Sequence, residues 1–202
     1  MNLLAIETSV PNASLCLYAG GEIRYRTEWQ AERNHDAHLF PALEQAMEAL
    51  DADQLSHILV GAGPGSYGGV RVALAAGVGI ATVCEAKLVA VESWAQLADA
   101  NACVVADARR GGWTVRFPDG RIEVLSSDEL AALEYPVYST EPVGRLPHAC
   151  KEGLVPTAEG LVYTWLSMSK EEQQAAEDRP AEPIYVRPPH ITVSTRKPWE
   201  VC

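Results

Sequence analysis

The sequence predicts an α/β protein with two lobes, of which the second is reduced and less regular. Two observations support this fold class. Strand and helix patterns alternate through the first hundred residues, and a turn at 118–120 between two short apolar runs belongs to a second series of elements. We therefore expect residues 1–101 to form the first lobe, and residues 102–202 to form a smaller lobe that ends in an extended tail.

Composition and charge disfavour several classes of function. The chain has 202 residues and 48% hydrophobic content, which is enough to build a substantial core. A formal charge of -11 without a cluster of Lys and Arg disfavours direct binding to nucleic acid or to an anionic membrane. The N-terminus lacks a basic start followed by a long apolar run, so we expect a soluble, cytoplasmic protein with no membrane contact.

The five cysteines are odd in number, far apart and without a CxxC pair: Cys16, Cys84, Cys103, Cys150 and Cys202. Such spacing predicts neither a zinc site nor a disulfide framework. We expect reduced thiols, and the alternative is a nucleophilic cysteine paired with a distant histidine.

The first hundred residues read as strands followed by alternating helices and strands. Short apolar or alternating runs predict a three-strand meander at 3–8, 13–18 and 22–29. Leucines at helical spacing predict a helix over 38–50, in which Pro41 fits only in the first turn or at a kink.

Strands are then expected at 57–60 and 87–91, and Ser93 with Gln96 resembles a capping box that begins a helix through residue 100. The resulting order is strand, strand, strand, helix, strand, helix, strand. This is the order of a ribonuclease H-like half of an actin-type fold.

The chain is organised around residues 60–84, a glycine loop followed by an apolar helix. Five glycines and a proline lie between Gly61 and Gly69, and Arg71 is the one charge in the helix predicted over 70–84. Such a helix requires cover on nearly every side, either from its own sheet or, on one face, from a second protein. The loop matches neither GxxxxGK[ST] nor a clean GxGxxG, so a phosphate site and a structural turn both remain open.

The second half contains shorter elements. Strands are predicted at 103–107, 113–117, 121–125 and 137–139, with the second and third joined as a hairpin. Ser126 and Glu129 predict a capped short helix, and a longer helix is predicted over 157–168. Residues 169–183 are acidic and polar and are predicted to be a solvated connection, before two consecutive prolines extend the tail.

Three groups of polar residues could carry chemistry. His35 and His38, with Asp36 between them, have a spacing that fits either a metal site or a capped helix start. Glu7 at the end of the first strand is interpreted as a buried or turn carboxylate, and the family resemblance described below implies the alternative, a ligand for a metal or phosphate. Asp107 and Arg109 are interpreted as a structural salt bridge, because no nucleophile or base accompanies them.

Several segments together resemble a known family. LLAIETS, NHDAHLFPAL, GAGPGSYGGVRVALAAGVGIA, VVADARRGGWTV and IYVRPPHIT occur in the order found in the bacterial TsaB family of tRNA threonylcarbamoyladenosine biosynthesis proteins, which are glycoprotease-like. The resemblance covers the first half closely and the second half thinly. It implies an actin-like or HSP70-like two-lobed fold with ribonuclease H-like lobes. The chain departs from the family pattern at Glu7, where many members carry Asp, and at Gly68, where Thr is common.

The resemblance also implies a role. The chain would be a non-catalytic scaffold that pairs with a TsaD-type catalytic subunit and works with a TsaE-type ATPase. This assembly modifies the adenosine next to the anticodon of tRNAs reading ANN codons, and tRNA would meet this chain only indirectly. The family pairs its subunits through the first two helices, where we expect the contact residues His38, Leu39, Leu43, Met47, Arg71, Leu74, Ala75 and Val78.

The resemblance implies no catalytic, metal-binding or cofactor-binding residue in this chain. Catalytic relatives bind metal with histidines spaced H-x-x-x-H, whereas His35 and His38 are three apart, and the glycines after Gly120 are isolated. The alternative is a stand-alone ATP- or metal-dependent enzyme, a carbamoyl transferase or metallopeptidase, that uses Glu7, the histidines and the glycine loop. A homodimer through the same two helices is a further alternative.

Overall fold

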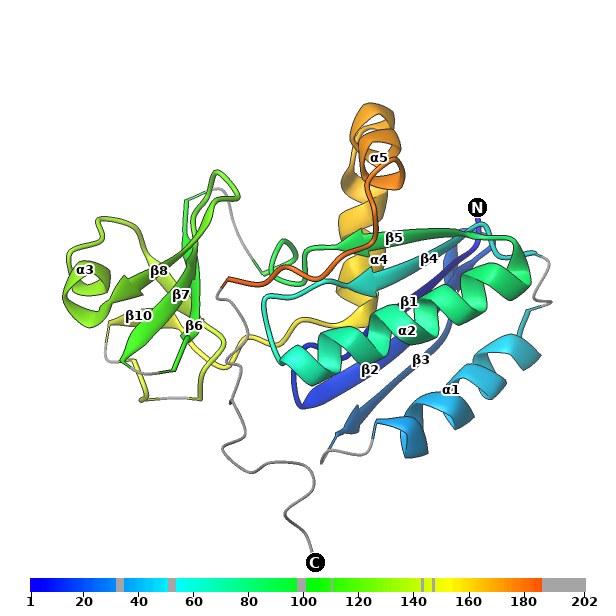
Figure 1. Ribbon diagram of the computed structural model, residues 1–202, viewed down its shortest axis with the longest axis horizontal. Helices are drawn as coiled ribbons and strands as arrows, with labels where there is room; N and C mark the ends of the chain where they lie inside the picture. The colour runs from blue at the N-terminus through cyan, green and yellow to red at the C-terminus, as the bar shows by residue number, and fades with distance from the viewer. Residues whose placement is uncertain are drawn as a thin grey trace, which may run out of the picture.

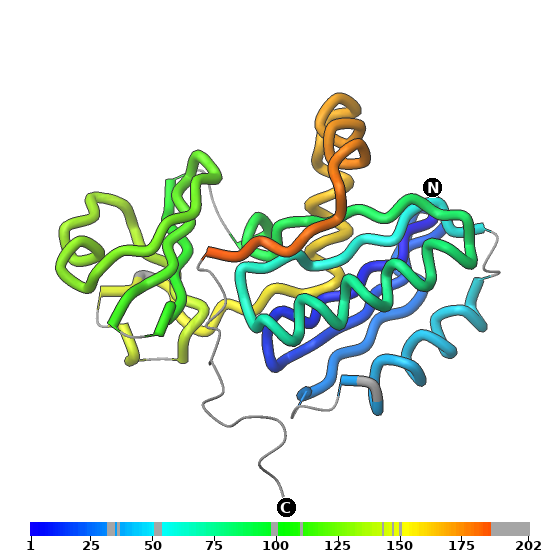
Figure 2. The backbone as a smooth tube through the Cα atoms, in the orientation of Figure 1, coloured from blue at the N-terminus to red at the C-terminus, as the bar shows by residue number. Residues whose placement is uncertain are grey.

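Two five-stranded sheets each form the centre of one lobe. The structure is a computed structural model, and it describes residues 1–31, 35–50, 54–97, 101–109, 111–142, 144–146 and 148–186. The first sheet has the strand order β3-β2-β1-β4-β5 and the second has the order β10-β9-β6-β7-β8. Figures 1 and 2 show the two lobes side by side, with the first sheet on the right.

The first sheet contains the predicted meander and two parallel strands. An antiparallel meander is formed by β1 (Leu3–Glu7), β2 (Asn12–Ala19) and β3 (Glu22–Gln30). The strands β4 (His57–Gly61) and β5 (Lys87–Val91) continue the sheet in parallel with β1. Every residue of β1 is buried, as expected for a central strand with helices on both faces. The predicted ribonuclease H-like order is confirmed.

Helices cover both faces of this sheet. α1 (Asp36–Glu48) and α2 (Tyr67–Cys84) lie on one face, and α4 (Ala158–Ser167) lies on the other. The period of two in β1 divides its side chains accordingly. Leu4 and Ile6 belong to the core beneath α1 and α2, whereas Leu3 and Ala5 belong to the core beneath α4.

The first two predicted helices begin earlier than the sequence indicated. α1 begins two residues before His38, so Pro41 lies inside the helix rather than in its first turn. α2 begins at Tyr67 because the hydroxyl of Ser66 accepts the backbone N–H of Gly69 at 3.3 Å and caps the helix there.

The helix predicted from Ser93 is wrong in the residues that can be compared, because residues 93–97 form turns; residues 98–100 lie outside the described part. The two side chains expected to cap a helix bind distant segments instead. The hydroxyl of Ser93 accepts the N–H of Gly63 at 3.1 Å, and Oε1 of Gln96 accepts the N–H of Thr157 at 2.9 Å. These contacts compete with local capping.

The second lobe confirms the predicted hairpin and adds one strand. Its elements are β6 (Cys103–Asp107), β7 (Gly112–Arg116), β8 (Ile122–Ser126), α3 (Ser127–Ala131), β9 (Val137–Ser139) and β10 (Ala149–Lys151). β7 and β8 pair antiparallel across the predicted turn, and Ser126 with Glu129 forms the predicted capping box. β10 was not predicted.

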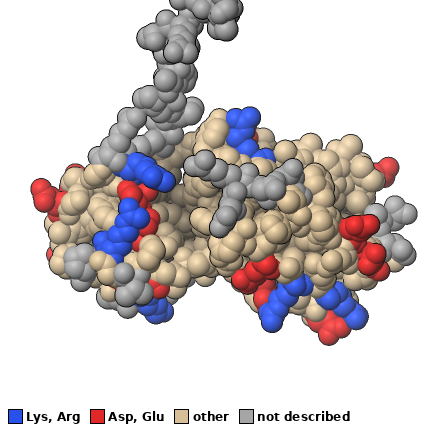
Figure 3. Space-filling model, turned by 90° about the horizontal axis from the view of Figure 1, so that it is seen from below, with Lys and Arg blue, Asp and Glu red and all other residues tan. Residues whose placement is uncertain are grey.

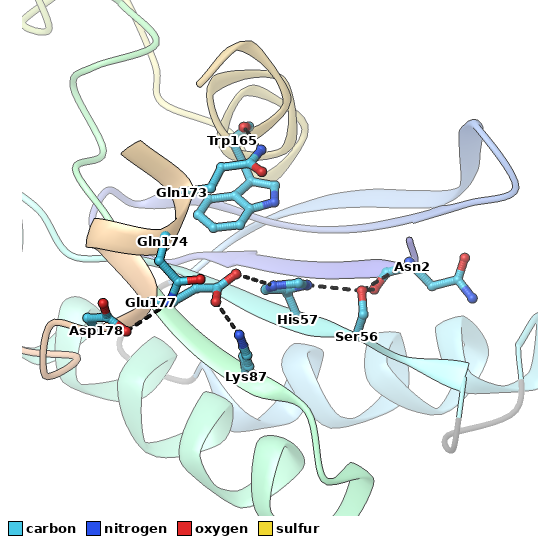
Figure 4. Close-up of polar contacts among 9 residues, drawn as sticks. All are labelled: Asn2, Ser56, His57, Lys87, Trp165, Gln173, Gln174, Glu177 and Asp178. Carbon is cyan, nitrogen blue, oxygen red and sulfur yellow. Dashed lines mark hydrogen bonds and ion pairs between the residues drawn. The ribbon is translucent and has the colours of Figure 1, made fainter. Parts of the chain in front are cut away.

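The end of the chain returns to the first lobe, so the halves of the sequence do not match the lobes one to one. Trp165 of α4 is buried between the helix and the first sheet. The predicted solvated connection contains a further helix, α5 (Lys170–Glu177), whose Glu177 reaches His57 of β4 and Lys87 of β5 (Figure 4). Ile184 then donates its N–H to the carbonyl of Ala62 at 2.8 Å, at the start of the glycine loop.

Candidate functional site

An apolar groove of about 720 Å³ lies between α1 and α2. Its walls are formed by Leu39, Phe40 and Leu43 of α1 and by Ala75, Gly79, Ile80 and Val83 of α2. Phe40 is 63% exposed and Val83 is 78% exposed, which is unusual for large apolar side chains. Figure 3 views the molecule from below the orientation of Figure 1. Most of the described surface of the larger lobe (right) is uncharged in this view, and its charged side chains gather mostly along one edge.

The groove exists because α2 is apolar on more faces than its own sheet can cover. Its inner face, which includes Val70, Ala73 and Ala81, is buried against the sheet. Its outer face carries Val78 and Val83, both exposed. Among the described helices, α2 alone is long and apolar enough to cross a membrane by length and composition, a test that core helices of globular proteins also pass.

The predicted contact residues do not all face outward. Those that are exposed are His38, Arg71, Ala75 and Val78, and those that are partly buried are Leu43 and Met47. Leu39 and Leu74 instead belong to the core, with exposed fractions of 2% and 9%. Helical spacing alone could not separate the buried face of α2 from its exposed face, because α2 is apolar almost throughout. Leu39 borders the groove from below, and Leu74 offers a partner little surface.

The glycines of α2 serve its two faces separately. A Cβ on Gly77 would lie 2.6 Å from Cγ1 of Val60 and 2.8 Å from Cδ1 of Leu88, so this glycine allows α2 to approach its own sheet. A Cβ on Gly79 would meet nothing within 4 Å. The inner face of α2 therefore packs on its own sheet, and Gly79 lies on a face that the described residues leave open.

The glycine loop packs against the end of β1. A Cβ on Gly61 would lie 2.2 Å from the Glu7 carboxylate, and one on Gly69 would lie 1.8 Å from the carbonyl oxygen of Thr8. The hydroxyl of Thr8 also donates to the carbonyl of Gly69 at 2.7 Å. These contacts within the chain account for Gly61 and Gly69 as parts of a structural turn.

Glu7 is a buried carboxylate at the centre of this packing. Its Oε1 accepts the N–H of Ser9 at 2.7 Å, while Oε2 has no hydrogen-bond partner among the described residues. Burial raises the pKa of Glu7 above its ordinary value, because ionisation in this surrounding is unfavourable.

The other candidate polar residues have different roles from those predicted. His38 is exposed and stacks on Trp29, with ring centroids 6.5 Å apart, and the side chain of Asp36 lies outside the described part. The described residues contain no group of three or more metal-binding side chains. The predicted Asp107–Arg109 salt bridge is wrong: Asp107 pairs with Arg145 at 2.8 Å and accepts only the backbone N–H of Arg109.

The cysteines that can be described are buried. Cys16, Cys84 and Cys103 form no disulfide. Burial raises the pKa of Cys16 to about 12, which opposes formation of a reactive thiolate at neutral pH. Cys202 and the side chain of Cys150 lie outside the described residues.

Two tyrosines at the first turn of α2 were missed by the sequence reasoning. Tyr67 and Tyr185 stack with ring centroids 5.2 Å apart, although 118 positions separate them in the sequence. The guanidinium of Arg71 donates to the hydroxyl of Tyr67 at 2.6 Å. The four-residue spacing of Tyr67 and Arg71 was the available signal, but the helix was expected to begin only at Val70.

The sheet order, the two lobes and the open helix pair define an actin-like α/β protein with an apolar surface on its first lobe. Two solved structures from Pseudomonas aeruginosa have this fold. One is described as an uncharacterized protein with similarity to peptidase YEAZ, with a TM-score of 0.67, 23% identity, and coverage of 92% of this chain and 99% of that one. The other is YeaZ, with a TM-score of 0.64, 24% identity, and coverage of 91% and 99%.

The sequence comparisons define the family. The model of the family described as TsaD, tRNA N6-adenosine threonylcarbamoyltransferase, matches residues 29–154, and the chain belongs to this family. It is also similar to the tRNA threonylcarbamoyladenosine biosynthesis protein TsaB of Haemophilus influenzae, at 29% identity over 102 residues. That match covers 50% of this chain and 43% of the relative, less than half of its length. The predicted resemblance is confirmed.

Proposed function

We propose that this chain is a non-catalytic subunit in the biosynthesis of threonylcarbamoyladenosine in tRNA, and that it binds a TsaD-type catalytic subunit through α1 and α2. The observation that carries the proposal is the exposed apolar groove between these helices. Together with a TsaE-type ATPase, the assembly modifies the adenosine next to the anticodon of tRNAs reading ANN codons. The chain acts there as a cytoplasmic scaffold.

The groove has the chemistry of a helix-docking surface. Its exposed side chains, such as Phe40 and Val83, gain about 25 cal/mol for each Å² of apolar area removed from water. The small residues Ala75 and Gly79 let the backbone of a partner helix come close to α2. An amphipathic helix with side chains spaced three and four apart fits such a groove.

The negative charge of this chain supports tRNA binding by the partner subunit. A phosphate backbone requires compensating Lys and Arg, whereas this chain carries a formal charge of -11. We therefore place the tRNA contacts on the catalytic subunit, with this chain stabilising that subunit in its working arrangement. Measuring metal and nucleotide bound to the purified chain tests the alternative, an ATP- or metal-dependent activity of its own.

The proposed interface can be tested with one charged substitution and a matched control. Val78→Arg places a cation on the exposed face of α2, adjacent in the chain to Gly79 of the groove, whereas Val155→Arg makes the same change at a site 38% exposed and outside both helices. We expect Val78→Arg to weaken binding to the TsaD-type subunit about 100-fold or more, because an unpaired charge would be buried in the complex. Val155→Arg should bind as the wild type does.

Circular dichroism melting shows whether both variants remain folded. Equal co-purification of Val78→Arg and the wild type would exclude this face as the interface. Leu74→Arg is unsuitable for this test, because Leu74 is buried and its replacement would unfold the lobe. Light scattering of the isolated chain against concentration tests whether a second copy occupies the same groove when the partner is absent.

A further inference from the structure

The C-terminal segment reaches the same helix that forms the groove. After α5, residues 181–186 run along the first lobe toward the glycine loop (Figure 1). The N–H of Ile184 is bound to the carbonyl of Ala62 at 2.8 Å, and the ring of Tyr185 stacks on that of Tyr67 at an interplanar angle of 26°. Tyr67 is 47% exposed and Tyr185 is 44% exposed, so the pair forms part of the surface.

Arg71 lies over the Tyr67 ring of this aromatic pair. Its guanidinium carbon is 5.2 Å from the centre of the Tyr67 ring, and Nη1 donates to the Tyr67 hydroxyl at 2.6 Å. Among the described residues, no carboxylate forms an ion pair with Arg71, although the chain as a whole is strongly acidic. Tyr67 therefore orients the guanidinium of Arg71. The other N–H groups of this guanidinium can donate to another molecule.

Tyr67 and Arg71 lie on the same helix as the groove-lining residue Ala75. Arg71 is one turn from Ala75 and two turns from Val78 along the exposed face of α2. It is also the one charge between Tyr67 and Cys84. Tyrosine and arginine are the residue types that contribute most to binding at protein interfaces, and a guanidinium held by stacking loses little side-chain entropy on binding.

We propose that Tyr67, Arg71 and Tyr185 form a polar anchor at one end of the docking surface, and that Arg71 receives a carboxylate of the partner subunit. The segment 181–186 acts as a positioning element, because Tyr185 supports the ring on which Arg71 rests. The partner surface then combines apolar helical side chains over the groove with an Asp or Glu opposite the start of α2. This inference rests on the proposed function and specifies the chemistry of its partner.

The experiment measures the affinity of the full chain for the TsaD-type subunit of the same organism by calorimetry at low and high salt. Arg71→Glu should weaken binding about 30-fold or more, because two carboxylates would then face each other. Arg71→Lys should lose about fivefold, since lysine cannot reproduce the stacked, forked geometry. Arg179→Glu changes the same charge at an exposed position after α5 and should stay within about twofold of the wild type.

Two aromatic variants test the positioning role. Tyr185→Ala should weaken binding about fivefold, and this loss should disappear in the background of Arg71→Ala, because Tyr185 acts through the arginine. Tyr67→Phe keeps the ring but removes the hydroxyl, and it should reduce the salt dependence of binding less than Arg71→Ala does. Melting curves identify any variant that has lost its fold.

The outcomes separate the anchor from the docking function. If Arg71→Glu binds within about twofold of the wild type while Val78→Arg does not bind, the anchor is overturned and the groove remains the interface. If the wild-type chain does not bind the subunit at all, both proposals are overturned. Equal losses for Tyr185→Ala with and without Arg71 would remove the positioning role of the C-terminal segment.

Discussion

The buried carboxylate of Glu7 accounts for a glycine at position 61 and makes the folding stability of the chain depend on pH. The carboxylate fills the space that a side chain on residue 61 would need, which explains why glycine stands there. Burial raises its pKa, so the folded protein holds the proton more tightly than the unfolded chain does. The favourable contribution is therefore complete below the unfolded pKa and is lost as pH rises through the folded pKa.

Glu7→Gln should reveal this linkage, because glutamine stays neutral at every pH. We expect the melting temperature of Glu7→Gln, relative to that of the wild type, to increase between about pH 5 and about pH 8. Glu123→Gln changes a partly exposed carboxylate in the other lobe and is the control. A difference that stays constant over this range would show that Glu7 is ionised without cost.

At the scale of the element, α2 has two faces with opposite requirements. Gly77→Ala should destabilise the chain by about 1–3 kcal/mol, because the added methyl group would overlap Val60 and Leu88. Gly79→Ala should stabilise it by about 0.5–1 kcal/mol, because alanine is the better helix former and meets only open space. Urea unfolding of both variants measures the difference, and a loss of stability in both would mean that Gly79 is also covered.

α5 is attached to the sheet by one carboxylate (Figure 4). Oε1 of Glu177 lies 2.9 Å from Nε2 of His57, and Lys87 pairs with the other oxygen. His57 also contacts the ring of Trp165 in α4, at a centroid distance of 5.2 Å. The hydrogen bonds from Lys87 and then His57 lower the pKa of Glu177 below its ordinary value.

Because that pKa is lowered, the contribution of Glu177 is present above its unfolded pKa and is lost as pH falls through the folded pKa. Glu177→Gln should cost about 1 kcal/mol near neutral pH, and the cost should shrink in acid below about pH 4. Glu171→Gln, on an exposed position of α5, is the control. Hydrogen exchange of α5 should rise in Glu177→Gln alone, and unchanged exchange would contradict the role of this carboxylate.

At the scale of the whole molecule, local patterns predicted most elements but not their distant partners. The meander and the parallel strands were recognisable because their apolar residues alternate or run continuously. Ser93 and Gln96 misled because their side chains bind Gly63 and Thr157, which no local pattern reveals. α5 was missed because it buries none of its residues and so lacks an apolar stripe.

The candidate site was predictable to the level of two helices and no further. The apolar excess of α2 indicated an uncovered face, but which residues form it depends on how the helix sits on its sheet. Leu74 and Val78 have equal apolar character in the sequence, yet one is in the core and the other is 53% exposed. Tyr185 could not be placed at all, because its partner Tyr67 lies far away in the sequence.

The central claim is that the outer face of α1 and α2 binds a TsaD-type subunit. Size-exclusion chromatography with light scattering on this chain, on the catalytic subunit of the same organism and on their mixture tests it most directly. We predict a new peak with one copy of each chain, which Val78→Arg abolishes and Val155→Arg preserves. Independent elution of the two wild-type proteins, with and without ATP, would contradict the claim.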